Sequence, residues 1–117
     1  MDNSNAVVAL SALAQDSRLS LFRRLVALGP EGAFAGELAN HLQIPANTLS
    51  FHLKTLSQAG LVSSESLGRH VRYRADVERM QALLGFLSDH CCDGQPQRCA
   101  PFARNPAPAK AAKAANA

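Results

Sequence analysis

Three cysteines near the end of the chain carry its clearest potential for metal or redox chemistry. They are the only cysteines in the sequence, and they lie within the segment DHCCDGQPQRCAPF as Cys91, Cys92 and Cys99. Thiolates are soft ligands, which favour soft ions over hard cations such as magnesium and calcium. Trivalent arsenic suits three thiolates in a pyramid, because its lone pair occupies the remaining apex. The stretch from Gly94 to Pro96 can turn the chain, so that Cys99 folds back onto the adjacent pair.

The residues alone leave other uses of these cysteines open. Zinc could take His90 as a fourth ligand, although adjacent cysteines differ from the usual C-x2–4-C spacing of zinc sites. A redox switch needs a reactive cysteine with a resolving cysteine nearby, and the cysteines could equally be incidental and bind nothing. A small cysteine-based enzyme would need a pocket and an activated nucleophile. These cysteines instead follow the end of a helix, so we expect that the protein is not an enzyme.

The elements that accompany these cysteines are organised around residues 37–62, which predict two short helices joined by a tight break. In the second helix, leucines recur at i, i+4 and i+7, the spacing of one buried face: Leu49, Leu53 and Leu56. The Ile44–Pro45 pair separates the two helices. Asn47 or Thr48 is expected to cap the second helix, and Gly60 can end it in a left-handed conformation.

The opposite side of this second helix carries polar residues and one aromatic side chain. At about 100° per residue, Asn47, Phe51 and Lys54 fall opposite the leucines, and Ser50 lies on their flank. A soluble helix gains nothing by exposing Phe51 to water, so this face implies a binding partner. The geometry suits a helix-turn-helix whose second helix enters the major groove of double-stranded DNA. The residues expected in the groove are Asn47, Thr48, Ser50, Phe51 and Lys54.

Two predicted strands follow this helix and form a basic hairpin. Apolar and basic residues alternate in the second strand, which favours one apolar and one basic face. Such a hairpin directly after a DNA-reading helix would be a wing, and Arg69 at its tip and Arg72 are expected to contact DNA. The alternative is that Arg72 and Arg74 only protect an edge strand with charge. The two strands are predicted at residues 61–66 and 70–75.

Helices are also predicted on both sides of this region. Residues 4–14 favour a short, closely packed helix that is rich in alanine. Asp16 is expected to cap the next helix, whose inner face would consist of Leu19, Phe22, Leu25 and Val26. A last helix begins after Asp76 and presents an apolar seam of Val77, Met80, Leu83, Leu84 and Leu87. Because a small monomer has little left to bury such a seam, we expect it to pair with a second copy in a homodimer.

Length and composition fit one small domain followed by a tail. The 117 residues include 12 Lys and Arg against 9 Asp and Glu, and the net charge of +3 permits nucleic-acid binding without demonstrating it. We expect a DNA-binding and dimerisation domain at residues 1–92 and a flexible tail at residues 93–117, which carries Cys99. No segment approaches the length of a membrane span, and no leader-like segment begins the chain. A cytoplasmic protein is therefore expected.

The order of these elements resembles the ArsR/SmtB family of bacterial metal-responsive repressors, over residues 6–92. The likeness is carried by ALSALAQDSRLSLFRRL (9–25), ELANHLQIPANTLSFHLKTLSQAGLV (37–62) and GRHVRYRA (68–75). The resemblance implies a mainly α fold with a two-stranded β-wing, which is a dimeric winged helix-turn-helix of five helices. It also implies a transcriptional repressor that binds operator DNA and releases it when a metal or metalloid binds.

Members of this family differ in where the sensor site lies. One group has a Cys-x-Cys at the start of the first helix of the helix-turn-helix, where this chain has Phe34, Ala35 and Gly36. Another group binds zinc across the last helices, but residues 76–92 have no matching pair of histidines. The chain is instead similar to members with an adjacent cysteine pair at the end of the last helix and a third cysteine in the tail. The resemblance therefore implies a repressor that responds to As(III) or Sb(III) through Cys91, Cys92 and Cys99, with a zinc- or redox-responsive repressor as the alternative.

Overall fold

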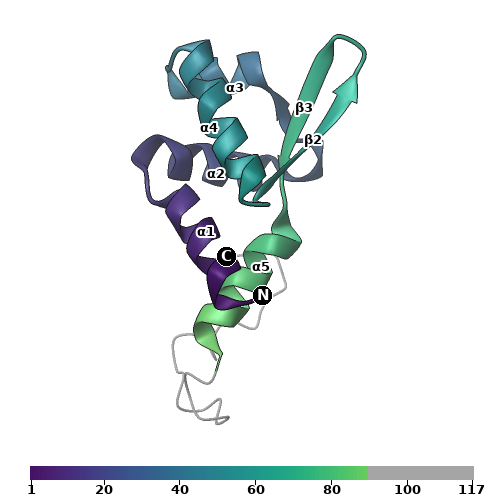
Figure 1. Ribbon diagram of the computed structural model, residues 1–117. Coiled ribbons are helices and arrows are strands. Elements are labelled where there is room, and N and C mark those ends of the chain that lie inside the picture. Colours follow the sequence, from purple (N-terminus) through teal and green to yellow (C-terminus); the bar gives the residue numbers. More distant parts are fainter. Residues whose placement is uncertain (90–117) are drawn as a thin grey trace. The chain divides into compact units, whose positions relative to one another are not determined.

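The computed structural model describes residues 1–89, which fold into five α-helices and a small antiparallel sheet (Figure 1). In chain order the elements are α1 (Asn3–Leu13), α2 (Asp16–Leu28), the 3-10 turn η1 (Gly29–Glu31), β1 (Ala33–Phe34), α3 (Ala35–Leu42), α4 (Ala46–Gln58), β2 (Val62–Leu67), β3 (His70–Ala75) and α5 (Val77–Ser88). The predicted mainly α winged helix-turn-helix with five helices is thereby confirmed. None of the helices within residues 1–89 has the length and apolar character needed to cross a membrane. The tail expected at residues 93–117 lies outside the described residues.

Helix α1 packs through its alanines and leaves its larger side chains outside. Asp2 caps the helix, because its Oδ1 accepts the backbone N–H of Asn5 at 2.8 Å. The buried residues are Ala6, Ala9 and Ala12, and the exposed apolar residues are Val7, Val8 and Leu10. Small side chains on the inner face bring the helix close to its neighbours. The larger apolar side chains of α1 are left for another surface.

Helix α2 differs from the prediction in two details. Its cap is Gln15 and not Asp16, because the Gln15 side-chain oxygen accepts the backbone N–H of Arg18 at 2.9 Å. Leu19, which was predicted on the inner face, is 43% exposed. The buried face consists of Leu21, Phe22 and Leu25. This face is inward because α2 packs against α4 and β3 on that side. Helical spacing alone does not determine which face of α2 is buried.

Helices α3 and α4 are joined by a tight turn in which Gln43 has a left-handed conformation, with φ of 55°. The backbone N–H of Gln43 donates to the carbonyl of Ala39, which closes the end of α3. Helix α4 ends as predicted, with Gly60 at φ of 79°. The N–H of Leu61 then donates to the carbonyl of Leu56 at 3.0 Å, a Schellman arrangement that terminates the helix firmly.

The wing belongs to a three-stranded sheet in the order β1-β3-β2, and not to a two-stranded one as expected. Strands β2 and β3 pair along their whole length, which leaves Gly68 (φ of 65°) and Arg69 as a two-residue turn. Strand β1 pairs with the other edge of β3 through Ala33↔Tyr73 and Phe34↔Arg72. A strand of two residues shows no alternation of apolar and polar residues, so the sequence could not reveal β1.

One buried cluster connects the helices with the sheet. Its largest fully buried side chains are Leu21, Leu25, Leu38, Leu49, Leu53, Leu56 and Leu61. Leu83 of α5 joins this cluster, whereas Leu87 on the same helix is exposed. Figure 1 shows that β2 begins near the end of α4 and that the hairpin extends toward the end of the domain where α4 starts, so the hairpin tip and the start of α4 lie at the same end. The core thus holds α4 and the wing as one unit.

Candidate nucleic-acid interface

The outer face of α4 carries the five residues that were predicted to read DNA. All five are exposed: Asn47, Thr48, Ser50, Phe51 and Lys54. The three leucines on the inner face are at most 1% exposed, so the predicted two-sided character of the helix is confirmed. Phe51 is 62% exposed, the highest value among the exposed large hydrophobic side chains of residues 1–89. Such exposure of an aromatic ring on a well-packed helix indicates a binding surface.

The start of α4 differs from the prediction, because neither Asn47 nor Thr48 is its N-cap. Pro45 occupies that position with φ of −62°, the value that its ring imposes. The Asn47 Oδ1 instead accepts the backbone N–H of Thr48 at 2.9 Å. The Asn47 amide keeps both N–H donors and a second lone pair, which is the set that can pair with an adenine edge. Asn47 therefore remains able to contact a base.

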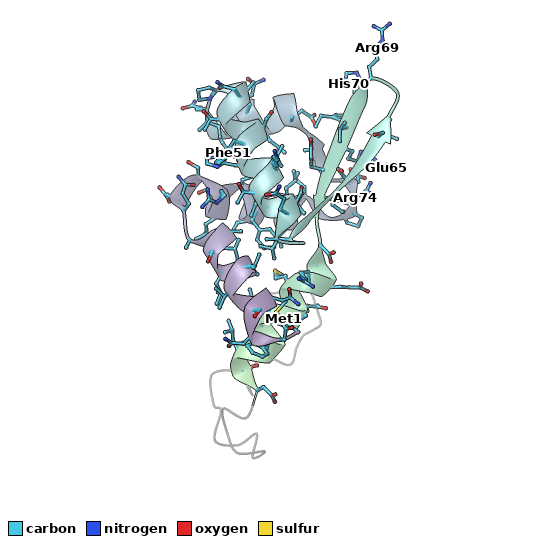
Figure 2. All side chains as sticks on the ribbon, in the orientation of Figure 1. Met1, Phe51, Glu65, Arg69, His70 and Arg74 are labelled. Carbon is cyan, nitrogen blue, oxygen red and sulfur yellow. The ribbon has the colours of Figure 1, made fainter. Side chains whose placement is uncertain are left out.

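The arginines of the wing have different surroundings. Figure 2 shows Arg69 at the tip of the hairpin, where it is exposed. Arg74 is committed to the protein, because its Nη2 lies 2.9 Å from Glu65 Oε1 and its Nε donates to the carbonyl of Pro30 at 2.9 Å. Arg74 thus ties the hairpin to the loop after α2, in agreement with the structural alternative for this residue. Arg69 is left with its charge available to DNA.

Phe34 was not among the predicted site residues, but its ring contacts two side chains of the wing. Its ring centroid lies 5.5 Å from the Arg72 Cζ. The ring of His70 is also 5.5 Å away, at an interplanar angle of 53°. These contacts arise from the pairing of β1 with β3, two segments far apart in sequence. No local pattern could have revealed them.

His52 packs on the inner side of α4 as a buried histidine. It is 7% exposed, and its Nδ1 has no hydrogen-bond partner within residues 1–89. Burial lowers the pKa of His52 below the ordinary value of 6.5, and the positive charge of Arg18 lowers it further. His52 therefore acts as a neutral packing residue on the buried side of α4.

The fold should lose stability as the pH falls below 6.5, because of His52. Above this value His52 is neutral in both the folded and the unfolded chain, so its contribution is fully present. At lower pH the unfolded chain binds the proton first, and stability falls by up to about 1.4 kcal/mol per pH unit until the folded pKa is reached. Denaturant unfolding across this range would show the loss. His52→Gln should flatten the profile; a slope equal to that of the unchanged protein would exclude His52 as the cause.

The predicted metalloid ligands Cys91, Cys92 and Cys99 lie outside the described residues. Of the predicted site residues, the structure therefore describes only Asn47, Thr48, Ser50, Phe51, Lys54, Arg69 and Arg72. Among residues 1–89, no three His, Cys, Asp or Glu side chains come together as a potential metal site. The start of α3 holds Ala35 and Gly36.

Comparison with known proteins finds regulators of transcription. Residues 13–65 match a family described as a helix-turn-helix domain. The chain is 37% identical over 89 residues to the HTH-type transcriptional regulator CmtR of Mycobacterium tuberculosis, which covers 69% of this chain and 73% of CmtR. It is also 37% identical over 78 residues to the uncharacterized HTH-type transcriptional regulator YceK of Bacillus subtilis, which covers 65% of this chain and 76% of YceK.

Three solved structures share the fold of this chain. An ArsR-like transcriptional regulator from Rhodococcus sp. RHA1 is 25% identical, with a TM-score of 0.68 and coverage of 85% of this chain and 90% of that one. A homodimeric winged helix-turn-helix DNA-binding domain from Mycobacterium bovis, a possible ArsR-family regulator, is 26% identical, with a TM-score of 0.59 and coverage of 79% and 85%. A possible transcriptional regulator for arsenical resistance is 26% identical, with a TM-score of 0.61 and coverage of 80% and 94%.

Proposed function

This chain belongs to the ArsR family of winged helix-turn-helix transcriptional regulators, and on that premise we propose that it is an operator-binding repressor released by trivalent arsenic or antimony. The observation that carries the DNA-binding part is the exposed outer face of α4, with Phe51 at its centre. The proposal about the effector is based on the three cysteines Cys91, Cys92 and Cys99.

Each residue on the face of α4 has a chemical role in this proposal. Asn47 and Ser50 hydrogen-bond to base edges in the major groove, and Phe51 packs against a thymine methyl group. Lys54 and Arg69 contact phosphates, so they contribute affinity that falls as salt rises. In a homodimer the two α4 helices would meet half-sites about one helical turn apart on a near-palindromic operator.

The homodimer is supported by the apolar side chains that α1 and α5 leave exposed. Val7 is 53% exposed on α1, and Leu87 is 53% exposed on α5. Single exposed apolar residues are common, but several large ones on two terminal helices suit a protein interface. The solved Mycobacterium bovis domain that resembles this chain is itself homodimeric. A second copy of the chain is therefore the proposed occupant of this surface.

Replacing Val7 with glutamate should dissociate the dimer. An unpaired charge buried in an interface costs about 3–5 kcal/mol, so the dissociation constant should rise by more than about 100-fold. Light scattering after size exclusion would measure the mass, and operator binding should weaken in parallel. Leu19→Glu, which places the same charge at an exposed site on α2, serves as the matched control. A Val7→Glu protein with the mass and operator affinity of the unchanged protein would remove α1 from the interface.

The effector proposal rests on the donor set and on one structural neighbour. Three thiolates match the coordination that trivalent arsenic or antimony requires, and they select against hard cations. The solved structure of a possible transcriptional regulator for arsenical resistance resembles this chain over most of its length. Since thiols must ionise to bind, the response should weaken at low pH. The reduced cytoplasm, where thiols persist, is the compartment that suits this chemistry.

A mobility-shift assay on the DNA upstream of the protein's own coding sequence tests the function directly. The unchanged protein should bind, and arsenite or antimonite should release it. Release requires that the metalloid binds the free dimer more tightly than the DNA-bound dimer. Zinc and peroxide are the comparison effectors. Release by zinc or peroxide but not by arsenite would favour a zinc- or redox-responsive repressor. If the protein did not bind this upstream DNA at all, the DNA would not contain its operator.

A further inference from the structure

Three side chains gather on one face of the sheet, in the half of the wing nearer its tip: Phe34, His70 and Arg72. Alternate residues of a strand share a face, so His70 and Arg72 point to the same side of β3. Phe34 pairs directly with Arg72 across the β1–β3 ladder. Its ring contacts both the Arg72 guanidinium and the His70 ring, each at 5.5 Å. We call this group the Phe34 cluster.

Arg72 and Arg74 lie on the same face of β3 but use their charges differently. Arg74 forms an ion pair with Glu65 and a hydrogen bond to the carbonyl of Pro30. Arg72 is partly buried, and within residues 1–89 its guanidinium lies over the Phe34 ring. A cation–π contact needs no hydrogen-bond acceptor, so N–H groups of Arg72 stay available to another acceptor.

Three glutamates lie near Arg72, and each could in principle pair with its charge. Glu65 is directly opposite Arg72 in the β2–β3 ladder, and Glu31 and Glu37 line the same hollow as Arg72 and Phe34. The Glu65 carboxylate is bound to Arg74. The Glu37 Oε1 accepts the backbone N–H of Phe34 at 2.9 Å. Within residues 1–89, no ion pair joins Arg72 to Glu31, Glu37 or Glu65, so with its guanidinium over the ring Arg72 keeps a charge that can meet an anion.

We propose that Phe34 is a positioning residue for DNA binding, which holds the Arg72 guanidinium ready for a phosphate of the operator backbone. The proposal rests on the function proposed above. The DNA backbone is the anion that fits, because β3 belongs to the hairpin whose tip lies at the same end as the start of α4 (Figure 1). An arginine already held in place loses less conformational freedom when it binds. Without the ring, Arg72 would be free to turn toward the glutamates around it.

A double-mutant cycle on operator binding separates positioning from a merely structural role. Phe34→Leu removes the π face but keeps an apolar side chain at the start of α3, and it should weaken binding by about 2- to 5-fold per protomer. Phe34→Tyr keeps the ring and should bind as the unchanged protein does. Arg72→Ala should weaken binding and should reduce the slope of log affinity against log salt by about 0.9 for each phosphate that is no longer neutralised. In the Arg72→Ala background, Phe34→Leu should have no further effect.

Two results would overturn the proposal while leaving operator binding itself intact. The first is an equal loss of affinity from Phe34→Leu with and without Arg72, which would mean that the ring only supports the fold. The second is an unchanged salt slope in Arg72→Ala, which would mean that Arg72 touches no phosphate. Thermal unfolding of each variant checks the fold, and Phe34→Ile, suited to a strand position, replaces Phe34→Leu in the cycle if that variant fails to fold. If the unchanged protein does not bind its operator, the proposed function fails first.

Discussion

Replacing Cys91 with serine should strongly weaken the release of operator DNA by arsenite. A hydroxyl is a hard, neutral ligand at neutral pH, so the site would retain two of its three soft donors. Removal of a partner that only orients a metal ligand costs about 10- to 100-fold in affinity, and removal of a ligand should cost more than that. The arsenite concentration needed for half-release should therefore rise by more than about 100-fold. A mobility-shift titration with arsenite, repeated with antimonite, measures this change.

The effect should be confined to the effector response. Without arsenite, Cys91→Ser should bind the operator as tightly as the unchanged protein, because the cysteine segment follows α5 in the chain and lies apart in sequence from α4. Cys92→Ser and Cys99→Ser should behave in the same way, and Gln97→Ser provides a control within the same segment. Full release of Cys91→Ser at the arsenite concentration that releases the unchanged protein would disprove the three-thiolate site. Retained release by zinc or peroxide would point to the alternative effectors.

Replacing Phe51 with alanine should weaken operator binding strongly and leave the arsenite response in place. Phe51 is 62% exposed, so its ring gains its apolar contacts only when DNA covers it. Burial of part of an aromatic side chain contributes about 1 kcal/mol or more. Because a dimer places two copies on the operator, the combined effect should be about 2 kcal/mol, or about 30-fold in affinity. Fluorescence anisotropy with labelled operator DNA would measure it.

Stability measurements distinguish a weakened DNA contact from a damaged fold in this variant. Substitution of an exposed side chain changes stability by less than about 0.5 kcal/mol in most cases, so Phe51→Ala should unfold at the denaturant concentration of the unchanged protein. Leu19→Ala removes a comparably exposed apolar side chain from α2 and should not change operator affinity. If Phe51→Ala bound the operator with unchanged affinity, Phe51 would not belong to the DNA-reading surface.

Much of the fold could be predicted because it depends on local spacing. Leu49, Leu53 and Leu56 repeat with the period of a helix, and Gly60 supplies the left-handed conformation that ends it. The same spacing placed Phe51 and Lys54 on the outer face, where the structure has them. These features follow from bonds and contacts between residues a few positions apart. They are therefore visible in the sequence.

Other details of the local structure were predicted wrongly for a common reason. Leu19 and Leu21 are both apolar residues of α2, and only the position of α4 and β3 decided that Leu21 would be buried. The cap of α4 is Pro45 and not Asn47 or Thr48, because the turn after α3 sets where the helix begins. A spacing pattern allows several neighbouring faces and start points. Packing against distant elements selects among them.

The sequence by itself determined the two-sided character of α4, the basic hairpin and the clustering of three cysteines near the chain end, because each is a property of residue types and short spacings. Only the tertiary structure decided which contacts each arginine of the wing makes. Arg72 and Arg74 are equivalent by alternation, yet one contacts Phe34 and the other Glu65 and Pro30. The partners come from β1, β2 and η1, and their contact depends on the pairing of segments far apart in the chain, which no local pattern records.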